Sequence, residues 1–235
     1  MSEHVLTGRP AGPQGDPIIE GPSTAEVRWI LPGQLDASLV RWFGRFPAGM
    51  DSGEDAYLVD PLLRGLSVKI HAGRLFEAKL CHGSPGILDI AGRARGRIEA
   101  WRKWSFPIGL LGPDDVGPPG WTVVHKRRWS IRFQRVSGRL MAGVLERAPE
   151  SASAVDLTEV RSGGETWWSL GLEATGPAAL LSSTLQGTAA LMFAETPPGD
   201  VELDMSHCQS YAEWLSRRRV PGMTEIRDLR VGASA

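Results

Sequence analysis

The stretch VHKRRWSIRFQ, from Val124 to Gln134, decides the expected fold. Successive side chains of a β-strand point to opposite faces of a sheet, so the stretch divides into two sets. One set carries most of the charge and consists of Val124, Lys126, Arg128, Ser130 and Arg132. The other set contains all the large apolar side chains, Trp129, Ile131 and Phe133. This alternation predicts a strand with one polar and one apolar face.

Similar alternation recurs along the chain from Ala25 to Ala174. The polar sets add Glu26 and Arg28, then Ser67, Lys69 and His71, then Glu77 and Lys79, then Asp156 and Thr158, and finally Trp167, Ser169, Gly171 and Glu173. Together the polar sets hold more bases than acids. We therefore predict a mainly β protein, an antiparallel barrel whose lumen is polar and attracts an anion. Open sheets with one solvated face are the alternative explanation of the same pattern.

Length and composition limit the classes of protein. A chain of 235 residues with 42% hydrophobic residues can form one barrel domain with attached helices. The net charge of -1 argues against a nucleic-acid-binding protein. The sequence has two cysteines and shows no secretory signal or membrane-spanning run. We expect a cytoplasmic protein with free thiols, no nucleic-acid partner and no membrane role, and the oligomeric state stays open.

Glycine, proline and capping residues predict the organisation of the chain. Residues 1–23 are rich in glycine and proline and are expected to form a flexible leader, before a barrel domain at 24–220 and a tail at 221–235. Helices are expected after Asp36, from Pro177 to Ala194 and from Ser210 to Arg219, and the first can cover the apolar outside of the barrel. For residues 93–106, a strand with a helical turn and a short helix remain alternatives.

The order of these motifs resembles the CYTH superfamily, the triphosphate tunnel metalloenzymes that include class IV adenylyl cyclases and thiamine triphosphatases. The resemblance rests on AEVRW, LSVKIHAG, LFEAKL, VVHKRRWSIRF, VDLTEV, WWSLGLEA and QSYAEWL, in that order, between Ala25 and Arg218. It implies a closed eight-stranded antiparallel barrel with peripheral helices. It also implies a lumen that binds a triphosphate through bases and a divalent metal ion through acids.

The resemblance assigns roles by position. Phosphate ligands would be Lys69, Lys79, Lys126, Arg128 and Arg95, and Arg28, Glu77 and Arg132 join them as further ligand-binding residues of the polar lumen. A Mg or Mn ion would be held by Glu26, Asp156 and Glu173, of which Glu26 and Glu173 would be catalytic. The partner would be an anionic, phosphorylated small molecule.

Three acids expected from the family pattern are absent or displaced. Arg28 stands where the first strand has a second glutamate, Gly171 replaces the first glutamate of the late pair, and Thr158 stands in place of an acid. The leading hypothesis is a metal-dependent phosphohydrolase. The alternatives are a protein that binds an anionic metabolite without turnover and a barrel recruited for another small-molecule reaction.

Further expectations concern His71, Trp167, and the histidines and cysteines together. His71 lies on the polar side and could donate a proton, although a hydrated surface histidine is the commoner case. Trp167 shares a face with Glu173, where its ring could stack on a ligand or pack at the barrel end. The histidines and cysteines lack the spacing of a structural zinc site.

Overall fold

The chain forms a mainly β structure, described here from a computed structural model. The described residues are 19–108, 120–143, 148–199 and 201–218. The strands are β1 (Ile19–Pro32), β2 (Gly49–Leu58), β3 (Leu66–His71), β4 (Leu75–Ile90), β5 (Ala94–Pro107), β6 (Trp121–Val136), β7 (Arg139–Ala142), β8 (Ser151–Ser162) and β9 (Glu165–Thr175). The helices are α1 (Ala37–Phe43), α2 (Ala178–Met192) and α3 (Tyr211–Arg217).

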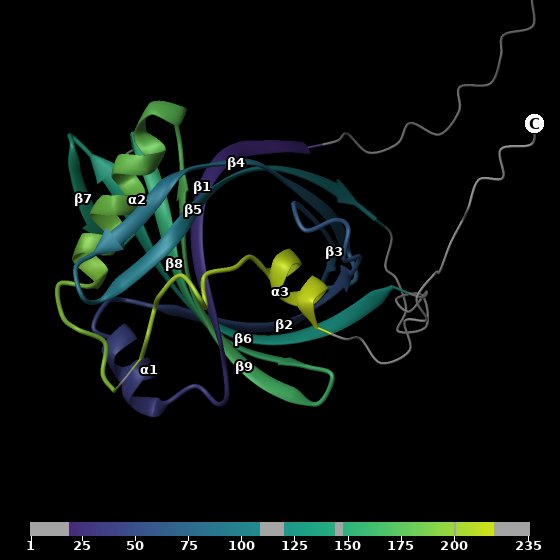
Figure 1. Cartoon of the computed structure of the whole chain (residues 1–235). Coiled ribbons are helices and arrows are strands. Elements are labelled where there is room, and N and C mark those ends of the chain that lie inside the picture. Colours follow the sequence, from purple (N-terminus) through teal and green to yellow (C-terminus); the bar gives the residue numbers. More distant parts are fainter. Residues whose placement is uncertain (1–18, 109–119, 144–147, 200, 219–235) are drawn as a thin grey trace, which may run out of the picture.

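Eight of these strands close into a barrel (Figure 1). The sheet has the order β2-β3-β4-β5-β1-β9-β8-β6-β7, and β2 also pairs with β6. That pairing joins the two ends of the sheet and leaves β7 as an extra strand beside the far part of β6. Every pairing is antiparallel. The predicted closed, eight-stranded antiparallel barrel is confirmed.

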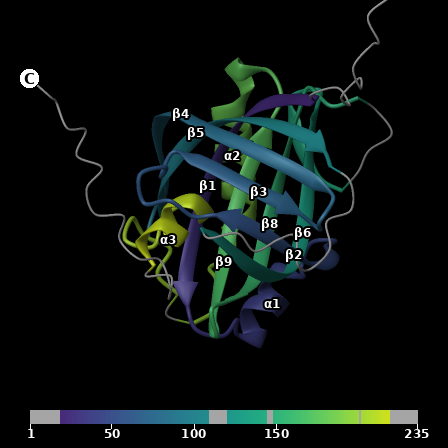
Figure 2. The same cartoon turned by 90° about the vertical axis from the view of Figure 1, so that its right-hand side faces the viewer.

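The main hydrophobic core lies outside the barrel wall, beneath α1 and α2. Asp36 caps α1, because its carboxylate accepts a hydrogen bond of 2.6 Å from the backbone N–H of Ser38. Phe43 of α1 and Leu185 of α2 are fully buried in the same cluster as Trp29 and Leu170 of the wall. Figure 2 shows the two helices on the outside of the strands. The apolar face of the strands is therefore the outer face, which leaves the charged face for the lumen.

Helix α3 lies at one opening of the barrel (Figures 1 and 2). Ser210 caps it by accepting a hydrogen bond of 3.2 Å from the N–H of Glu213. Trp214 and Leu215 pack in a second buried cluster with Ile30 and Val124 from the wall. Trp167 also packs there, 5.6 Å from the ring of Trp214, so the barrel-end alternative for this residue holds.

Three details differ from the sequence-based expectations. β1 begins at Ile19, so the expected leader overlaps the strand, which pairs with β5 from its first residue. The segment left undecided at 93–106 is almost wholly strand, because β5 runs from Ala94 to Pro107 between two partners. Helix α2 ends at Met192, two residues early, with Pro177 as its N-cap. Residues 1–18 and the expected tail at 221–235 lie outside the described residues.

Candidate functional site in the barrel lumen

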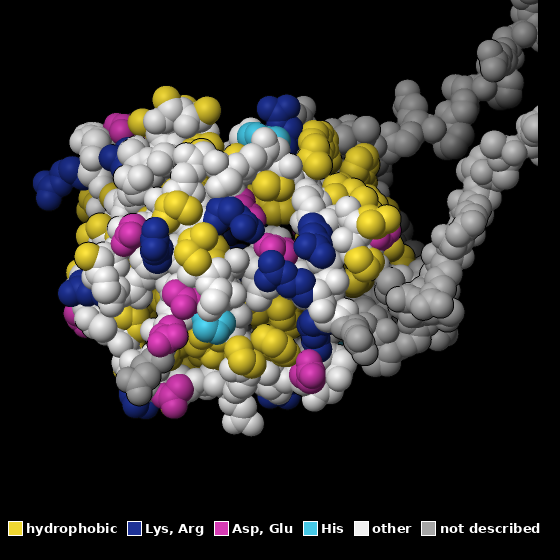
Figure 3. Space-filling model, viewed as in Figure 1, with side chains coloured by type: hydrophobic (Ala, Val, Ile, Leu, Met, Phe, Trp, Pro, Cys, Tyr) yellow, Lys and Arg dark blue, Asp and Glu magenta, His cyan; other side chains and the backbone are white. Residues whose placement is uncertain are grey.

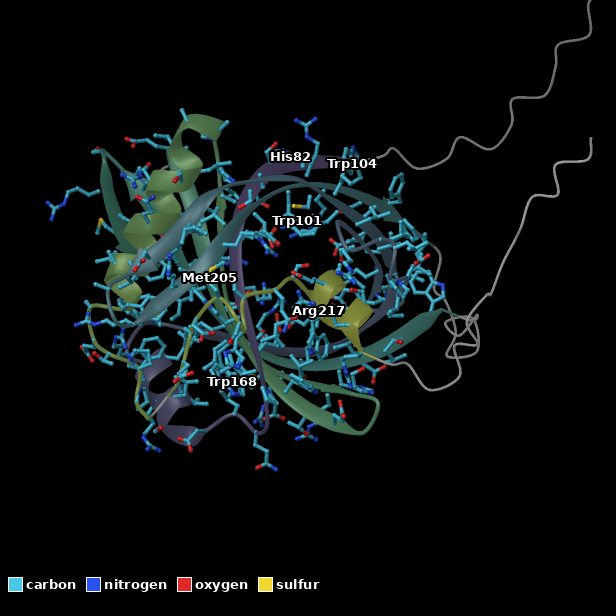
Figure 4. The ribbon with its side chains drawn as sticks, viewed as in Figure 1. His82, Trp101, Trp104, Trp168, Met205 and Arg217 are labelled. Carbon is cyan, nitrogen blue, oxygen red and sulfur yellow. The ribbon has the colours of Figure 1, made fainter. Side chains whose placement is uncertain are left out.

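The lumen contains a charged cavity of about 270 Å³. Six bases and five acids line it, with His71, Trp101 and two tyrosines: the bases are Arg28, Lys69, Lys79, Lys103, Lys126 and Arg128, and the acids are Glu26, Glu77, Glu99, Asp156 and Glu173. Figure 4 shows Trp101 directed into the barrel from β5 and Arg217 on α3 at its opening. Basic and acidic side chains are also mixed on the surface around this opening (Figure 3). The cavity therefore has nearly balanced charge.

A second cavity of about 840 Å³ continues the lumen toward the other end of the barrel. Arg128, Asp156 and Glu173 line both cavities. Gly49 and Arg132 line only the second one, at the end of β2 and along β6. Since three side chains line both spaces, the two cavities adjoin within the barrel, and together they are called the tunnel here.

Strand register places the side chains of the lumen in rows across the wall. Arg28 on β1 pairs with Gly171 on β9, which pairs with Asp156 on β8. The neighbouring row brings Glu26 opposite Glu173. Cross-strand partners have Cβ atoms about 5 Å apart, so side chains within a row meet over the lumen.

The guanidinium of Arg28 lies over the backbone of Gly171. A Cβ atom on Gly171 would stand 2.5 Å from both Cζ and a terminal nitrogen of Arg28, so the glycine provides the space that this side chain fills. Arg28 donates a hydrogen bond of 3.4 Å to the Ser169 hydroxyl and stacks 4.9 Å from the ring of Tyr211. Within the described part of the chain, Arg28 forms no ion pair shorter than 4 Å, although the charges of Asp156, Glu26 and Glu173 act on it from a greater distance. It is thus a base of the cavity with donors left for a ligand.

Lys79 joins two opposed acids. Its ammonium lies 2.5 Å from Glu26 and 3.6 Å from Glu173. Burial raises the pKa of Glu26, but the charges of Lys79 and Arg28 outweigh burial and hold that pKa below its ordinary value. Burial and the neighbouring charge of Glu26 raise the pKa of Glu173. Glu173 therefore binds a proton more readily than Glu26.

A buried carboxylate, Asp55, connects β2, β3 and β6. It accepts hydrogen bonds from Lys126 at 2.7 Å and from Lys69 at 3.2 Å, and it lies 2.6 Å from Nδ1 of His71. Burial opposes ionisation of Asp55, but the charges of Lys126 and Lys69 outweigh burial and hold its pKa well below the ordinary value. Asp55 is therefore an ionised acceptor that gathers three side chains of the lumen.

Lys126 also lies between two aromatic rings. Its ammonium is 4.7 Å from the ring centroid of Tyr57 and 4.2 Å from that of Tyr211, and it donates a hydrogen bond of 2.6 Å to the Tyr57 hydroxyl. Tyr57 and Tyr211 stack with centroids 5.9 Å apart. Such rings favour a cation over their faces. The contacts hold the ammonium at the lumen end beside α3.

Most of the residues selected from the sequence meet in this tunnel. Glu26, Arg28, Lys69, Glu77, Lys79, Lys126, Arg128, Asp156 and Glu173 line the first cavity, and Arg132 lines the second. Arg128 forms a two-pronged pair with Asp51, at 3.2 and 2.8 Å. Arg95 lines neither cavity, has 64% of its side chain exposed and lies 3.5 Å from Asp89. The structure therefore separates Arg95 from the other selected bases.

Sequence reasoning missed several lining or supporting residues, which are Asp55, Tyr57, Glu99, Lys103 and Tyr211. GEDAYL alternates Gly53, Asp55 and Tyr57 with Glu54, Ala56 and Leu58, and this short strand signal could have placed Asp55 and Tyr57 on one face. Glu99 and Lys103 lie in the segment where strand and helix stayed undecided. Because the segment is a strand, alternation of its side chains places Glu99 and Lys103 on the lumen side.

The donor set expected for Mg or Mn does not fit a metal site as it stands. Within the described residues, no group of three His, Cys, Asp or Glu side chains is arranged to hold a metal ion. Glu26 already accepts hydrogen bonds from Lys79 and from Thr24 at 2.8 Å. Asp156 accepts a hydrogen bond from Ser130, and Arg28 fills the space over Gly171. Hard divalent ions need several free oxygen ligands, and in this structure the carboxylate oxygens of Glu26 and Asp156 contact an ammonium group and hydroxyl groups.

Fold and site together define a class, a closed antiparallel tunnel barrel with a charged lumen. No protein-family model matches the chain, and no curated protein matches it. Among solved structures, it is similar to the PH1819 protein from Pyrococcus horikoshii OT3, with 14% identity, a TM-score of 0.38, and coverage of 81% of this chain and 97% of that chain.

It is also similar to the S. pombe Pct1 RNA triphosphatase in complex with the Spt5 CTD, with 10% identity, a TM-score of 0.34, and coverage of 77% of this chain and 79% of that chain. Similarity at this level carries no conclusion about function. No helix of the described residues is long and apolar enough to cross a membrane.

Proposed function

We propose that this chain binds a phosphorylated, anionic small molecule in the barrel lumen, and that binding needs no divalent metal ion. The observation that carries the proposal is the guanidinium of Arg28, which faces the cavity over Gly171 without an ion pair to any described residue. Guanidinium groups bind phosphate oxygens in two-pronged, charge-assisted hydrogen bonds. Arg28 supplies the first contact, and Lys79, Lys126 and Arg128 line the same cavity.

The charge balance of the lumen supports a ligand that replaces internal carboxylates. Lys69, Lys79, Lys103 and Lys126 each form an ion pair with an acid of the lumen wall. A phosphate group entering the cavity competes for these bases, and it gains most beside a base that has no carboxylate in direct contact. This favours binding of the ligand's anionic group beside Arg28.

Metal-dependent hydrolysis of a triphosphate is the second candidate. The direct pairing of Glu26 with Glu173 favours it, because two opposed acids repel each other and a cation relieves that repulsion. In the structure Lys79 already provides this cation. The second candidate therefore requires both acids to exchange Lys79 for a metal ion, whereas the first requires no metal ion.

Calorimetric titration with tripolyphosphate in the presence of EDTA tests the proposal. We expect binding by the unmodified protein, a tenfold to hundredfold loss in Arg28→Met, which corresponds to about 1.5–3 kcal/mol for a charged hydrogen bond, and no change in Arg95→Met. Arg95 is the matched control because it is an arginine outside both cavities.

The same titrations with Mg²⁺ and Mn²⁺ separate the two candidates. Binding only with metal, together with phosphate release that Glu173→Gln abolishes, would establish the metal-dependent triphosphatase instead. ATP and thiamine triphosphate, used as further probes, show whether an organic group adds affinity.

A further inference from the structure

His71 and Asp55 form a hydrogen-bonded pair in the lumen that anion binding does not require. His71 is the last residue of β3 and pairs in register with Asp55 on β2. Nδ1 of the imidazole lies 2.6 Å from Oδ1 of Asp55. The carboxylate is buried, whereas 47% of the His71 side chain is exposed and lines the cavity. One end of the imidazole is therefore fixed, and the ring remains accessible to water and ligand.

The surroundings of Asp55 determine which nitrogen of His71 carries the proton. Asp55 accepts hydrogen bonds from Lys126 and Lys69 and is ionised, so it can act only as an acceptor. Nδ1 of His71 must then be the donor. In the neutral imidazole the lone pair lies on Nε2, and no described residue forms a hydrogen bond with that atom. This is the tautomer required of a general base.

The same carboxylate brings phosphate-binding groups beside the imidazole. Lys69 lies two residues before His71 on β3, and its ammonium is 3.2 Å from Asp55. Lys126 approaches Asp55 from β6 at 2.7 Å. Both lysines line the cavity together with His71. A phosphoryl group held by these ammonium groups therefore lies next to the accessible edge of the ring.

We propose that His71 is a catalytic general base for metal-independent hydrolysis of a phosphoanhydride bond, with Asp55 as its positioning residue. The inference rests on the proposed binding function. A water oxygen forms a bond to the terminal phosphorus while the bond from phosphorus to the bridging oxygen breaks. The electron pair of the broken bond stays on the leaving oxygen, and the water proton moves to Nε2. The imidazolium then releases this proton to the leaving phosphate or to solvent. Lys69 and Lys126 offset the charge on the phosphoryl oxygens.

The test measures both binding of tripolyphosphate and release of orthophosphate in EDTA. Unmodified protein is expected to do both. His71→Ala is expected to keep its Kd within about twofold and to lose at least about a hundredfold in rate, since general base catalysis contributes on the order of 10²–10⁴. Added imidazole is expected to restore part of the rate in His71→Ala, because a diffusible base can enter the space left by the ring.

Two variants separate catalysis from structure. His71→Ala loses the hydrogen bond to Asp55 together with the base. His71→Asn keeps an N–H donor toward Asp55 but has no base, so it is expected to be as slow as His71→Ala and more stable. His125→Ala is the matched control, because His125 pairs with Glu54 at 2.8 Å on the neighbouring strand pair and lines no lumen cavity. Its rate is expected to equal that of the unmodified protein.

Each remaining outcome decides between the two proposals. Tripolyphosphate binding without phosphate release overturns the role of His71 and leaves the binding function standing. Full activity in His71→Asn overturns it as well. Absence of binding in EDTA overturns the proposed function, and the role of His71 with it.

Discussion

Glu26 and Glu173 are cross-strand partners that both form an ion pair with Lys79. Glu26 takes the shorter contact, at 2.5 Å, and Glu173 the longer one, at 3.6 Å. Lys79 at these unequal distances, with the further charge of Arg28, compensates the two partly buried carboxylates unequally. The consequence is unequal: the pKa of Glu26 is lowered and that of Glu173 is raised.

Glu173→Gln is expected to stabilise the protein at neutral pH. Because burial and Glu26 raise its pKa, the Glu173 carboxyl binds its proton more tightly in the folded than in the unfolded state, and its ionised form lowers stability at pH 7. We expect Tm to rise by about 2–4 °C, which corresponds to roughly 1 kcal/mol, and the gain to disappear at pH 4. Thermal unfolding of the variant at both values checks this. Exposed Glu202 provides the control, Glu202→Gln, and an equal effect there would contradict the explanation.

Two glycine substitutions are expected to have different effects. A Cβ on Gly96 would stand 2.6 Å from Val27 and 2.9 Å from Trp29 in the packed core, so Gly96→Ala should cost about 1–3 kcal/mol of stability. The three atoms nearest to a Cβ on Gly171 all belong to the flexible end of the Arg28 side chain. Gly171→Ala should therefore displace the guanidinium and keep Tm nearly unchanged. We expect about a fivefold loss of tripolyphosphate affinity, or roughly 1 kcal/mol, in Gly171→Ala. Unchanged affinity would remove Arg28 from the ligand site.

Restoring acids at two positions is expected to create a metal site. The double substitution Arg28→Glu with Gly171→Glu removes the guanidinium and places two carboxylates beside Glu26, Glu173 and Asp156. Without metal, repulsion should lower Tm. Mn²⁺ at about a hundred times its Kd should then raise stability by roughly 2.7 kcal/mol, whereas Tm of the unmodified protein should not respond. An equal response of the unmodified protein would show that Arg28 does not exclude a metal ion.

Glu77 is expected to contribute to loss of stability in acid. Burial raises its pKa, but the charges and hydrogen bonds of Lys69 and Lys103 outweigh burial and lower the pKa from 4.5 to about 2. A lowered folded-state pKa contributes stability that is complete above about pH 4.5 and is lost as pH falls toward 2. The free energy of unfolding of Glu77→Gln, measured from pH 5 to pH 2, should depend less steeply on pH than that of the unmodified protein, by up to one bound proton. Glu54→Gln, at an exposed position, should retain the original slope.

The barrel and its polar lumen were predictable because period-two alternation is a local property of each strand. VHKRRWSIRFQ separates its lumen side from its outer side without any knowledge of the neighbouring strands. The position of Arg95 outside the cavity was not predictable in this way, because Arg95 lies on the same face of β5 as Glu99. Arg95 lies beyond the cavity because β5 is staggered against its partner strands.

Partnerships between lumen side chains were also beyond the sequence pattern. Arg28 and Gly171 both depart from the pattern that the sequence resembles, but only their register shows that one fills the space provided by the other. Asp55 lies in a ten-residue strand whose first six residues are exposed, so its burial depends on contacts with β3 and β6. Such contacts arise from closure of the barrel.

The paired charges of the lumen couple ligand binding to proton uptake. When a phosphate attracts Lys69 or Lys79 away from Glu77 or Glu26, the released carboxylate loses the interaction that lowers its pKa, while it remains buried. Its proton affinity then rises, and the ligand enters together with protons from solution. The measured binding enthalpy will therefore depend on the ionisation enthalpy of the buffer. The lysines of the lumen thereby exchange carboxylate partners of the protein for phosphate groups of the ligand. Because the released carboxylates bind protons, the net charge of the lumen stays close to zero in both states.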